Sequence, residues 1–287
     1  MPPPPDPFSP PAFAELQANP GLWPAIDRAA EGTLDFFDDC HPDFRWIFHD
    51  RGRYMTGLAA IALLGMGQLT LPNLRAICAA MDVSSPGRVN RFWTGMRASG
   101  HLTMTRLPDG GLDRHLAASP VYIQHFRRHR RSIIEAVGVI WPATAQAALA
   151  AVADDARYLA IEAAICGVQA AHREVFQTQR DAPIFIFIER SGGLLILMHL
   201  FRQPGVTAGG PVPLSIHGLS RQFQVSRAHV KKLMTDARDK GLLVFDETAH
   251  TITFTPLAIE AYAVTSAMLL QAVRIGLESS VQAPATA

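Results

Sequence analysis

An internal repeat constrains the fold of this chain more than any other feature of its sequence. Three short segments recur in the same order, at offsets of 139, 141 and 136 residues: 47–51 (IFHDR) and 186–190 (IFIER), 97–102 (RASGHL) and 238–243 (RDKGLL), and Ser119-Pro120 and Thr255-Pro256. Offsets that differ by only a few residues indicate a duplicated structural unit with small insertions. The 287 residues are also enough for two domains of ordinary size.

The second copy has the pattern of two short helices followed by a hairpin. Apolar residues recur three and four positions apart after Ser215 and again after Ser226, and each serine is a favourable N-cap. Gly241 ends the second helix, because glycine adopts a positive φ at little cost. The runs 242–245 and 251–254 are strand-like and flank a polar turn.

The first copy repeats this order. A helix is predicted over 72–81, a second helix from the Ser85 cap to Gly100, and a hairpin over 102–107 and 112–116. The hairpin turn is Pro-Asp-Gly-Gly, which is strong turn chemistry, and it is longer than the turn of the second copy. Helix, helix and hairpin in sequence are typical of a winged helix-turn-helix.

Charge is segregated along the chain although the net charge is only +1. Residues 1–50 hold 2 basic and 9 acidic side chains, whereas residues 51–131 hold 12 basic and 3 acidic ones. Residues 132–189 are again acidic, with 3 basic against 7 acidic, and residues 190–250 are basic, with 8 against 4. Each basic block coincides with a predicted helix-turn-helix, which indicates two surfaces suited to a polyanion.

The spacing from the Ser226 cap to residues 241–244 (GLLV), with the order of elements around it, resembles the winged-helix transcriptional regulators, nearest to the MarR type. Such proteins usually carry one unit per chain and dimerise, so two units resemble a dimer fused into one chain. The resemblance implies a mainly α fold with small β-hairpin wings, in which two winged helix-turn-helix domains form a pseudo-dimer around a helical hub. The hub would be built from four helical stretches: 24–37, 119–140, 144–177 and 256–277.

The expected organisation has four parts. Residues 1–20 form a flexible proline-rich arm, 21–141 the first winged-helix unit, 142–280 the second unit, and 281–287 a flexible tail. The arm has no basic segment and no apolar stretch of signal-peptide length, which predicts a cytoplasmic protein without a membrane anchor.

The side chains expected to reach DNA lie on the outer face of the second helix of each motif, because a helix fits the major groove. In the first copy these are Arg88, Asn90, Arg91, Thr94 and Arg97, and in the second copy they are Arg227, His229, Lys231, Lys232 and Arg238. Ser85 and Ser226 are expected to cap these helices and to favour a phosphate there. Arg106 and Arg114 flank the first wing and are expected in a minor groove or on the backbone.

The cluster Arg127–Arg131 leaves two interpretations open: phosphate contacts, or ion pairs with hub acids such as Asp154 and Asp155. The MarR resemblance also implies a small-molecule effector in a cleft between hub and winged domains, for which the candidate residues are Trp46, Phe48, Tyr54, Phe185 and Phe187, although core packing accounts for the same aromatic residues.

No catalytic motif is present, and the three cysteines lack metal-site spacing, so neither an enzyme nor a cofactor is predicted. The predicted function is therefore sequence-specific binding of double-stranded DNA in transcriptional regulation, by a monomeric pseudo-dimer or a homodimer. Two alternatives stay open: a tandem winged-helix scaffold for protein partners, of the chromosome-segregation type, and a plasmid replication initiator.

Overall fold

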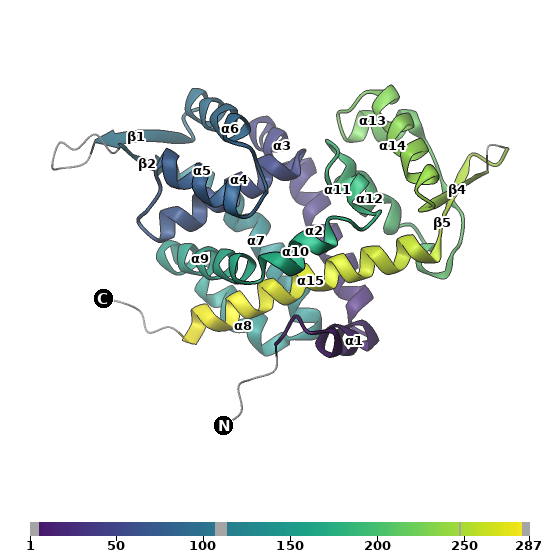
Figure 1. The fold of residues 1–287 in the computed structure, drawn as a ribbon, viewed down its shortest axis with the longest axis horizontal. Coiled ribbons are helices and arrows are strands. Elements are labelled where there is room, and N and C mark those ends of the chain that lie inside the picture. The colour runs from purple at the N-terminus through teal and green to yellow at the C-terminus, as the bar shows by residue number, and fades with distance from the viewer. Residues whose placement is uncertain (1–5, 107–113, 247, 283–287) are drawn as a thin grey trace.

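The computed structural model describes residues 6–106, 114–246 and 248–282, and these are mainly helical with two small antiparallel sheets (Figure 1). The first part of the chain contains α1 (Pro10–Ala18), α2 (Leu22–Asp39), α3 (Pro42–Phe48), α4 (Arg51–Gly65), α5 (Leu71–Ala80), α6 (Pro86–Ala98), β1 (Leu102–Arg106), β2 (Arg114–Ala118), α7 (Pro120–Ile140) and α8 (Pro142–Ala151). The second part contains α9 (Asp155–Ala171), α10 (Arg173–Gln179), α11 (Phe185–Ile188), α12 (Gly193–Phe201), a 3-10 turn (Val206–Ala208), β3 (Val212–Pro213), α13 (Ile216–Gln222), α14 (Arg227–Asp239), β4 (Leu243–Asp246), β5 (Thr251–Phe254) and α15 (Pro256–Gln282). The prediction of a mainly α fold with small hairpins is confirmed at this level.

The helix ends follow from the residues that the repeat has in common. Ser85 and Ser226 each accept a hydrogen bond from the backbone N–H three residues further on, at the start of α6 and α14. Gly100 and Gly241 follow these helices with the same φ of +73°, a left-handed conformation that glycine adopts without a Cβ clash. Local chemistry therefore fixes the length of both helices.

The turn between the two helices of each motif is also the same in both copies. Asp82 follows α5 with a φ of +49°, and Gln224 follows α13 with a φ of +51°. In each copy the next residue, Val83 or Val225, donates its N–H to a carbonyl of the preceding helix at 3.0 or 3.1 Å. A helix, a left-handed turn residue and a capped second helix thus occur twice.

The hairpins pair in register after these helices. β1 and β2 pair from Leu102 opposite Ala118 to Arg106 opposite Arg114. In the second copy β5 lies between β3 and β4, and the first copy keeps a trace of a third strand in the hydrogen bond from the Leu116 N–H to the Leu69 carbonyl, at 2.8 Å. In Figure 1 the two hairpins lie at opposite ends of the molecule, and α5, α6, α13 and α14 lie along one edge between them.

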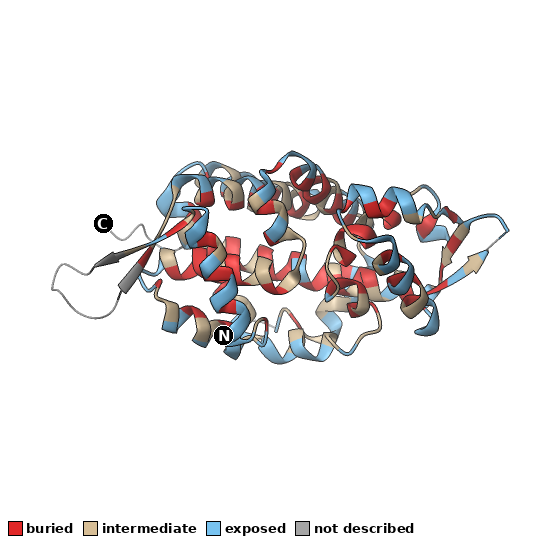
Figure 2. Ribbon diagram, turned by 90° about the horizontal axis from the view of Figure 1, so that it is seen from above, coloured by how far each residue is buried: buried red, intermediate tan, exposed pale blue. Residues whose placement is uncertain are grey.

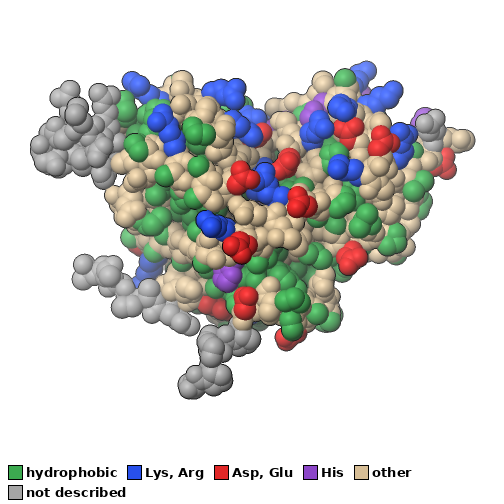
Figure 3. Space-filling model, in the orientation of Figure 1, with side chains coloured by type: hydrophobic (Ala, Val, Ile, Leu, Met, Phe, Trp, Pro, Cys, Tyr) green, Lys and Arg blue, Asp and Glu red, His purple; other side chains and the backbone are tan. Residues whose placement is uncertain are grey.

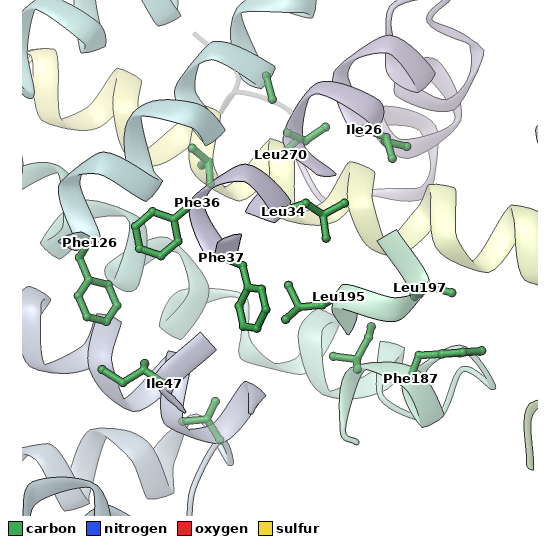
Figure 4. Close-up of a cluster of buried hydrophobic side chains, with 14 of the residues drawn as sticks. Ile26, Leu34, Phe36, Phe37, Ile47, Phe126, Phe187, Leu195, Leu197 and Leu270 are labelled. Carbon is green, nitrogen blue, oxygen red and sulfur yellow. The ribbon is translucent and has the colours of Figure 1, made fainter. Parts of the chain in front are cut away.

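The remaining helices form a shared centre. α2 packs against α7, α9 packs against both α4 and α15, and the buried apolar residues of the two copies form one continuous core (Figure 2). Figure 4 shows Phe36 and Phe37 of α2 in a cluster with Phe126 of α7 and Leu195 of α12. An element from the first copy thus completes the core of the second.

Three expectations about chain organisation differ from the structure. The expected arm contains α1, and Phe8 and Leu16 are only 4% and 6% exposed, so residues 8–18 are not a free arm. They are held because Phe8 packs with Met268 and Ala272 of α15 and thereby buries apolar surface. The single helix expected over 144–177 is three helices, α8, α9 and α10. The expected tail begins within α15, and residues 283–287 lie outside the described part.

α15 is the one described helix long and apolar enough to cross a membrane by length and composition, with a mean hydropathy of 1.3. The sequence patterns alone did not identify α15 as the longest apolar stretch of the chain. In its most apolar window of 18 residues, 56% of the residues are buried in the protein, and α15 packs against α1, α2, α8 and α9. A central helix of a globular protein has these properties.

Candidate nucleic-acid interface

α6 separates its apolar and polar side chains by helical period. Its inner face consists of Val89, Phe92, Trp93 and Met96, each at most 7% exposed. The five residues predicted to reach DNA from this helix are all exposed: Arg88, Asn90, Arg91, Thr94 and Arg97. The inner face packs against α4 and α5, so the helix is anchored with these five side chains outward.

Neighbouring side chains position two of these residues. The Arg88 guanidinium donates to the Asp50 carboxylate at 2.5 Å, and Asp50 is itself the N-cap of α4. The Asn90 amide oxygen accepts from the Arg75 Nε at 2.8 Å. Arg91 and Arg97 have no ion pair within the described residues. These two guanidinium groups are therefore the free cations of the helix.

α14 also presents a cationic face, but more of its positive charges are paired with other side chains. Arg227, Lys231, Lys232 and Arg238 are exposed as predicted. Three of them have partners: Arg227 contacts the His217 Nδ1 at 2.7 Å, Lys232 pairs with Asp236 at 3.0 Å, and Arg238 pairs with Asp239 at 3.0 Å. Only Lys231 among the four lacks a partner in the described part of the chain.

His229 does not face outward, contrary to the prediction. It is half-buried, and its Nε2 is enclosed without a hydrogen-bond partner among the described groups. Burial is the main cause that lowers the pKa of His49, and the charges of Arg53 and His229 lower this pKa further. Helical period gave the wrong face because this part of α14 packs on α11, a contact with no local signature.

The two cationic faces lie on the same edge of the molecule. Figure 3 shows Lys and Arg side chains gathered over α6 and over α13 and α14, with acidic side chains between the two groups. Arg221, at the end of α13, is also exposed and was not among the predicted contacts. The sequence could have indicated Arg221, because it is a basic residue next to the predicted turn of the motif.

The two hairpins that were expected to form wings are described only in part. The backbones of Arg106 and Arg114 face each other at the end of the first hairpin, but their side chains and the turn 107–113 lie outside the described residues. In the second wing the Asp246 carboxylate accepts from the backbone N–H groups of Thr248 and Ala249, and His250 is exposed with a φ of +53°. The turn of the second hairpin is therefore stabilised by hydrogen bonds to the side chain of its own Asp246.

The arginine cluster of α7 forms ion pairs within the protein. Arg127 pairs with Asp155, Arg128 pairs with Asp39 at 2.7 Å, and Arg130 forms a buried bidentate pair with Glu162 at 2.6 and 2.8 Å. The interpretation with acidic hub partners is confirmed for Arg127 and Asp155. The cluster is not a continuous track of free cations, because three of its four arginines have carboxylate partners.

A polar clamp between the copies was not predicted. Arg180 donates to the Asp82 carboxylate and carbonyl in the turn of the first motif and to Glu189 at 2.8 Å. In a second contact between the two copies, the Gly192 N–H donates to the His49 carbonyl at 2.7 Å. Partners so distant in sequence leave no local pattern, so only the tertiary structure reveals the clamp.

The aromatic residues proposed for an effector cleft are mainly packing residues. Phe187 is fully buried, and Phe48 and Tyr54 contact each other and Phe126 with ring centroids 4.9 to 6.3 Å apart. Trp46 is 39% exposed and lies under the Arg53 guanidinium, 4.4 Å from the ring centroid. Phe185 lines a cavity between the two copies.

No protein-family model, no curated protein and no solved structure matches this chain.

Proposed function

We propose that this protein is a cytoplasmic transcriptional regulator that binds double-stranded DNA sequence-specifically through two winged helix-turn-helix motifs arranged as a pseudo-dimer. The observation that carries the proposal is the repeated motif of helix, left-handed turn and capped helix. Both copies place a cationic helix on the same edge of the molecule (Figures 1 and 3). A helix anchored on one face and cationic on the other is suited to the major groove.

The first motif is proposed to supply most of the sequence readout. Arginine binds guanine bidentately and asparagine binds adenine, and α6 presents both residue types. Arg91 and Arg97 are free for such contacts, whereas Arg88 and Asn90 are held by Asp50 and Arg75. These tethers fix the direction of their side chains before DNA arrives, which lowers the entropy cost of binding.

The second motif is proposed to contribute mainly phosphate contacts. Lys231 and Arg221 have no ion pair among the described residues, and the exposed Lys232 and Arg238 exchange their carboxylate partners for phosphate at little cost, because ion pairs at the surface contribute at most about 1 kcal/mol. Unequal recognition helices favour an asymmetric DNA site over a palindrome.

Selection of bound sequences from a random DNA pool, followed by affinity measurements across a salt series, tests the proposal. The key variant is Arg88→Ala/Arg91→Ala/Arg97→Ala, and the matched control is Arg127→Ala/Arg128→Ala/Arg131→Ala, which removes three positive charges from α7 instead. We expect a recovered motif, a linear fall of log affinity with log salt, and loss of sequence preference in the α6 variant alone.

Equal loss of affinity in both variants, without loss of preference, means non-specific charge attraction and overturns the specific-binding proposal. Absence of DNA binding at moderate salt favours the scaffold for protein partners. A recovered motif found at replication origins rather than at promoters favours the replication initiator.

A further inference from the structure

A cavity of about 90 Å³ lies between the two copies, below the turn of the first helix-turn-helix. It is bounded by α4, the end of α5, α10, α11 and α15. Its walls are mostly apolar, and the principal lining side chains are Met55, Met81, Phe176, Phe185, Met268 and Leu269. Cavities of this kind at an interface between units, with few polar groups, are suited to small ligands.

One cation at this cavity has no ion pair among the described residues. Arg51 lines the cavity with its guanidinium 5.9 Å from the centre of the Phe185 ring, and burial lowers its pKa. It has no hydrogen bond or ion pair within the described residues. Two carboxylates, Asp82 and Glu189, act on Arg51 electrostatically, but both form their ion pairs with Arg180, so the Arg51 guanidinium remains available to a ligand.

A second polar group in the wall also lacks a partner. Thr265 is 4% exposed and lies on α15, and its hydroxyl oxygen is buried without a hydrogen bond among the described groups. A buried hydroxyl without a partner destabilises the protein, and a bound acceptor removes this cost. Arg173 stands at the rim and adds a second, exposed positive charge.

We propose that this cavity binds a small apolar monocarboxylate, with its carboxylate on the Arg51 guanidinium, an acceptor oxygen within reach of the Thr265 hydroxyl, and its hydrocarbon part among the methionine and phenylalanine side chains. The cavity is smaller than the roughly 150 Å³ that holds benzene in an engineered core. Three of the lining side chains are methionines, which are unbranched and adapt to a ligand more easily than other apolar side chains.

The site connects the hub to the DNA-binding edge. Met81 and Val83 flank the turn before α6, whereas Thr265 and Met268 belong to α15, so a ligand that contacts both biases the position of α6. This regulatory step rests on the proposed function, and binding itself does not. A ligand shifts DNA affinity only if it binds the two arrangements with different affinity.

The test begins without DNA, by titration calorimetry of the full chain with butanoate, hexanoate and benzoate, and with hexanamide and benzamide as uncharged matches. We expect saturable 1:1 binding of at least one carboxylate and at least tenfold weaker binding of its amide. Arg51→Gln should weaken carboxylate binding at least tenfold, whereas the remote control Arg131→Gln should leave it unchanged.

Thr265→Val, which keeps the side-chain volume and removes the unpartnered hydroxyl, provides a second test. It should fold and weaken the same carboxylate about three- to tenfold. No saturable binding of any of the three carboxylates, or binding that both Arg51→Gln and Thr265→Val leave intact, overturns the site. If carboxylate binding holds but does not change DNA affinity, the site stands and its regulatory role is wrong; if DNA binding is absent, only the proposed function fails.

Discussion

At the scale of single residues, a buried chain of polar groups links three helices of the centre. The Tyr54 hydroxyl lies 3.3 Å from the His129 Nδ1, and the His129 Nε2 lies 3.3 Å from the Thr33 hydroxyl. Because Thr33 donates to the Ala29 carbonyl, it accepts from the Nε2–H, and Tyr54 donates to Nδ1. His129 is therefore neutral, and burial lowers its pKa to about 3.

This histidine makes stability depend on pH. Its pKa is about 3 in the folded protein against 6.5 in the unfolded chain, so the unfolded state takes up a proton first as the pH falls. The stabilising contribution is present above pH 6.5 and is lost progressively towards pH 3. From pH 7.5 to 5.0 we expect His129 alone to cost about 2 kcal/mol of unfolding free energy.

Urea unfolding of the wild type and of His129→Gln at both pH values checks this expectation. The variant should be less stable at pH 7.5 but should lose about 2 kcal/mol less than the wild type between the two pH values. An equal loss in both proteins would show that His129 does not titrate on unfolding.

The Arg130–Glu162 pair, 5% and 2% exposed, is a second buried group of the centre. We expect Glu162→Gln to destabilise the fold by about 3–5 kcal/mol, because it leaves a buried guanidinium without its counter-charge. The exposed pair of Arg128 and Asp39 serves as control, and Arg128→Ala should cost less than about 1 kcal/mol. If the denaturant midpoints of Glu162→Gln and Arg128→Ala differ by less than the experimental error, this expectation is wrong.

At the scale of elements, the N-terminus of α6 combines two roles in Ser85. The hydroxyl caps the helix by accepting from the backbone N–H of Arg88, and the exposed helix end belongs to the proposed DNA edge. Asn and Asp cap about as well as Ser, but only Asp adds a negative charge.

The two capping variants are therefore expected to separate stability from DNA binding. Ser85→Asn and Ser85→Asp should keep the unfolding free energy within about 0.5 kcal/mol, whereas Ser85→Ala should lower it by about 1 kcal/mol. Ser85→Asp alone should weaken DNA affinity at least tenfold, through repulsion of phosphate. Equal DNA affinities for Asn and Asp would place this helix end away from DNA.

At the scale of the whole molecule, the two motifs are held on one core and clamped by Arg180. The distance between α6 and α14 is therefore fixed to within small movements. We expect a selected DNA site to lose affinity when about half a helical turn, roughly 5 base pairs, is inserted between its half-sites, because one half-site then faces away.

Anisotropy titrations with the native spacing, with 5 added base pairs and with a mutated second half-site check this expectation. The insertion should weaken binding as much as the mutated half-site does, since both leave one motif engaged. Affinity that does not depend on spacing would mean that the two motifs do not bind one site together.

The sequence by itself determined the local structure of both motifs. N-caps at Ser85 and Ser226, the helix-ending Gly100 and Gly241, and the apolar stripe of α6 all depend on residues within a few positions of one another. Such interactions involve only residues close together in the chain, so the sequence predicted the short helices and hairpins of both copies and the exposure of four of the five candidate residues of α14.

Which charged side chains have partners, and which side chains line the cavity between the two copies, follows only from the tertiary structure. His129 and Arg130 sit in a row of arginines that looks exposed, yet both are buried, because α2 and α9 close over that face of α7. The inward His229 and the unpaired Arg51 also depend on contacts between elements distant in sequence, α14 with α11 and α4 with the cavity between the copies. Desolvation and ion pairing depend on groups far away in the chain, and no spacing pattern in the sequence encodes which of these groups meet.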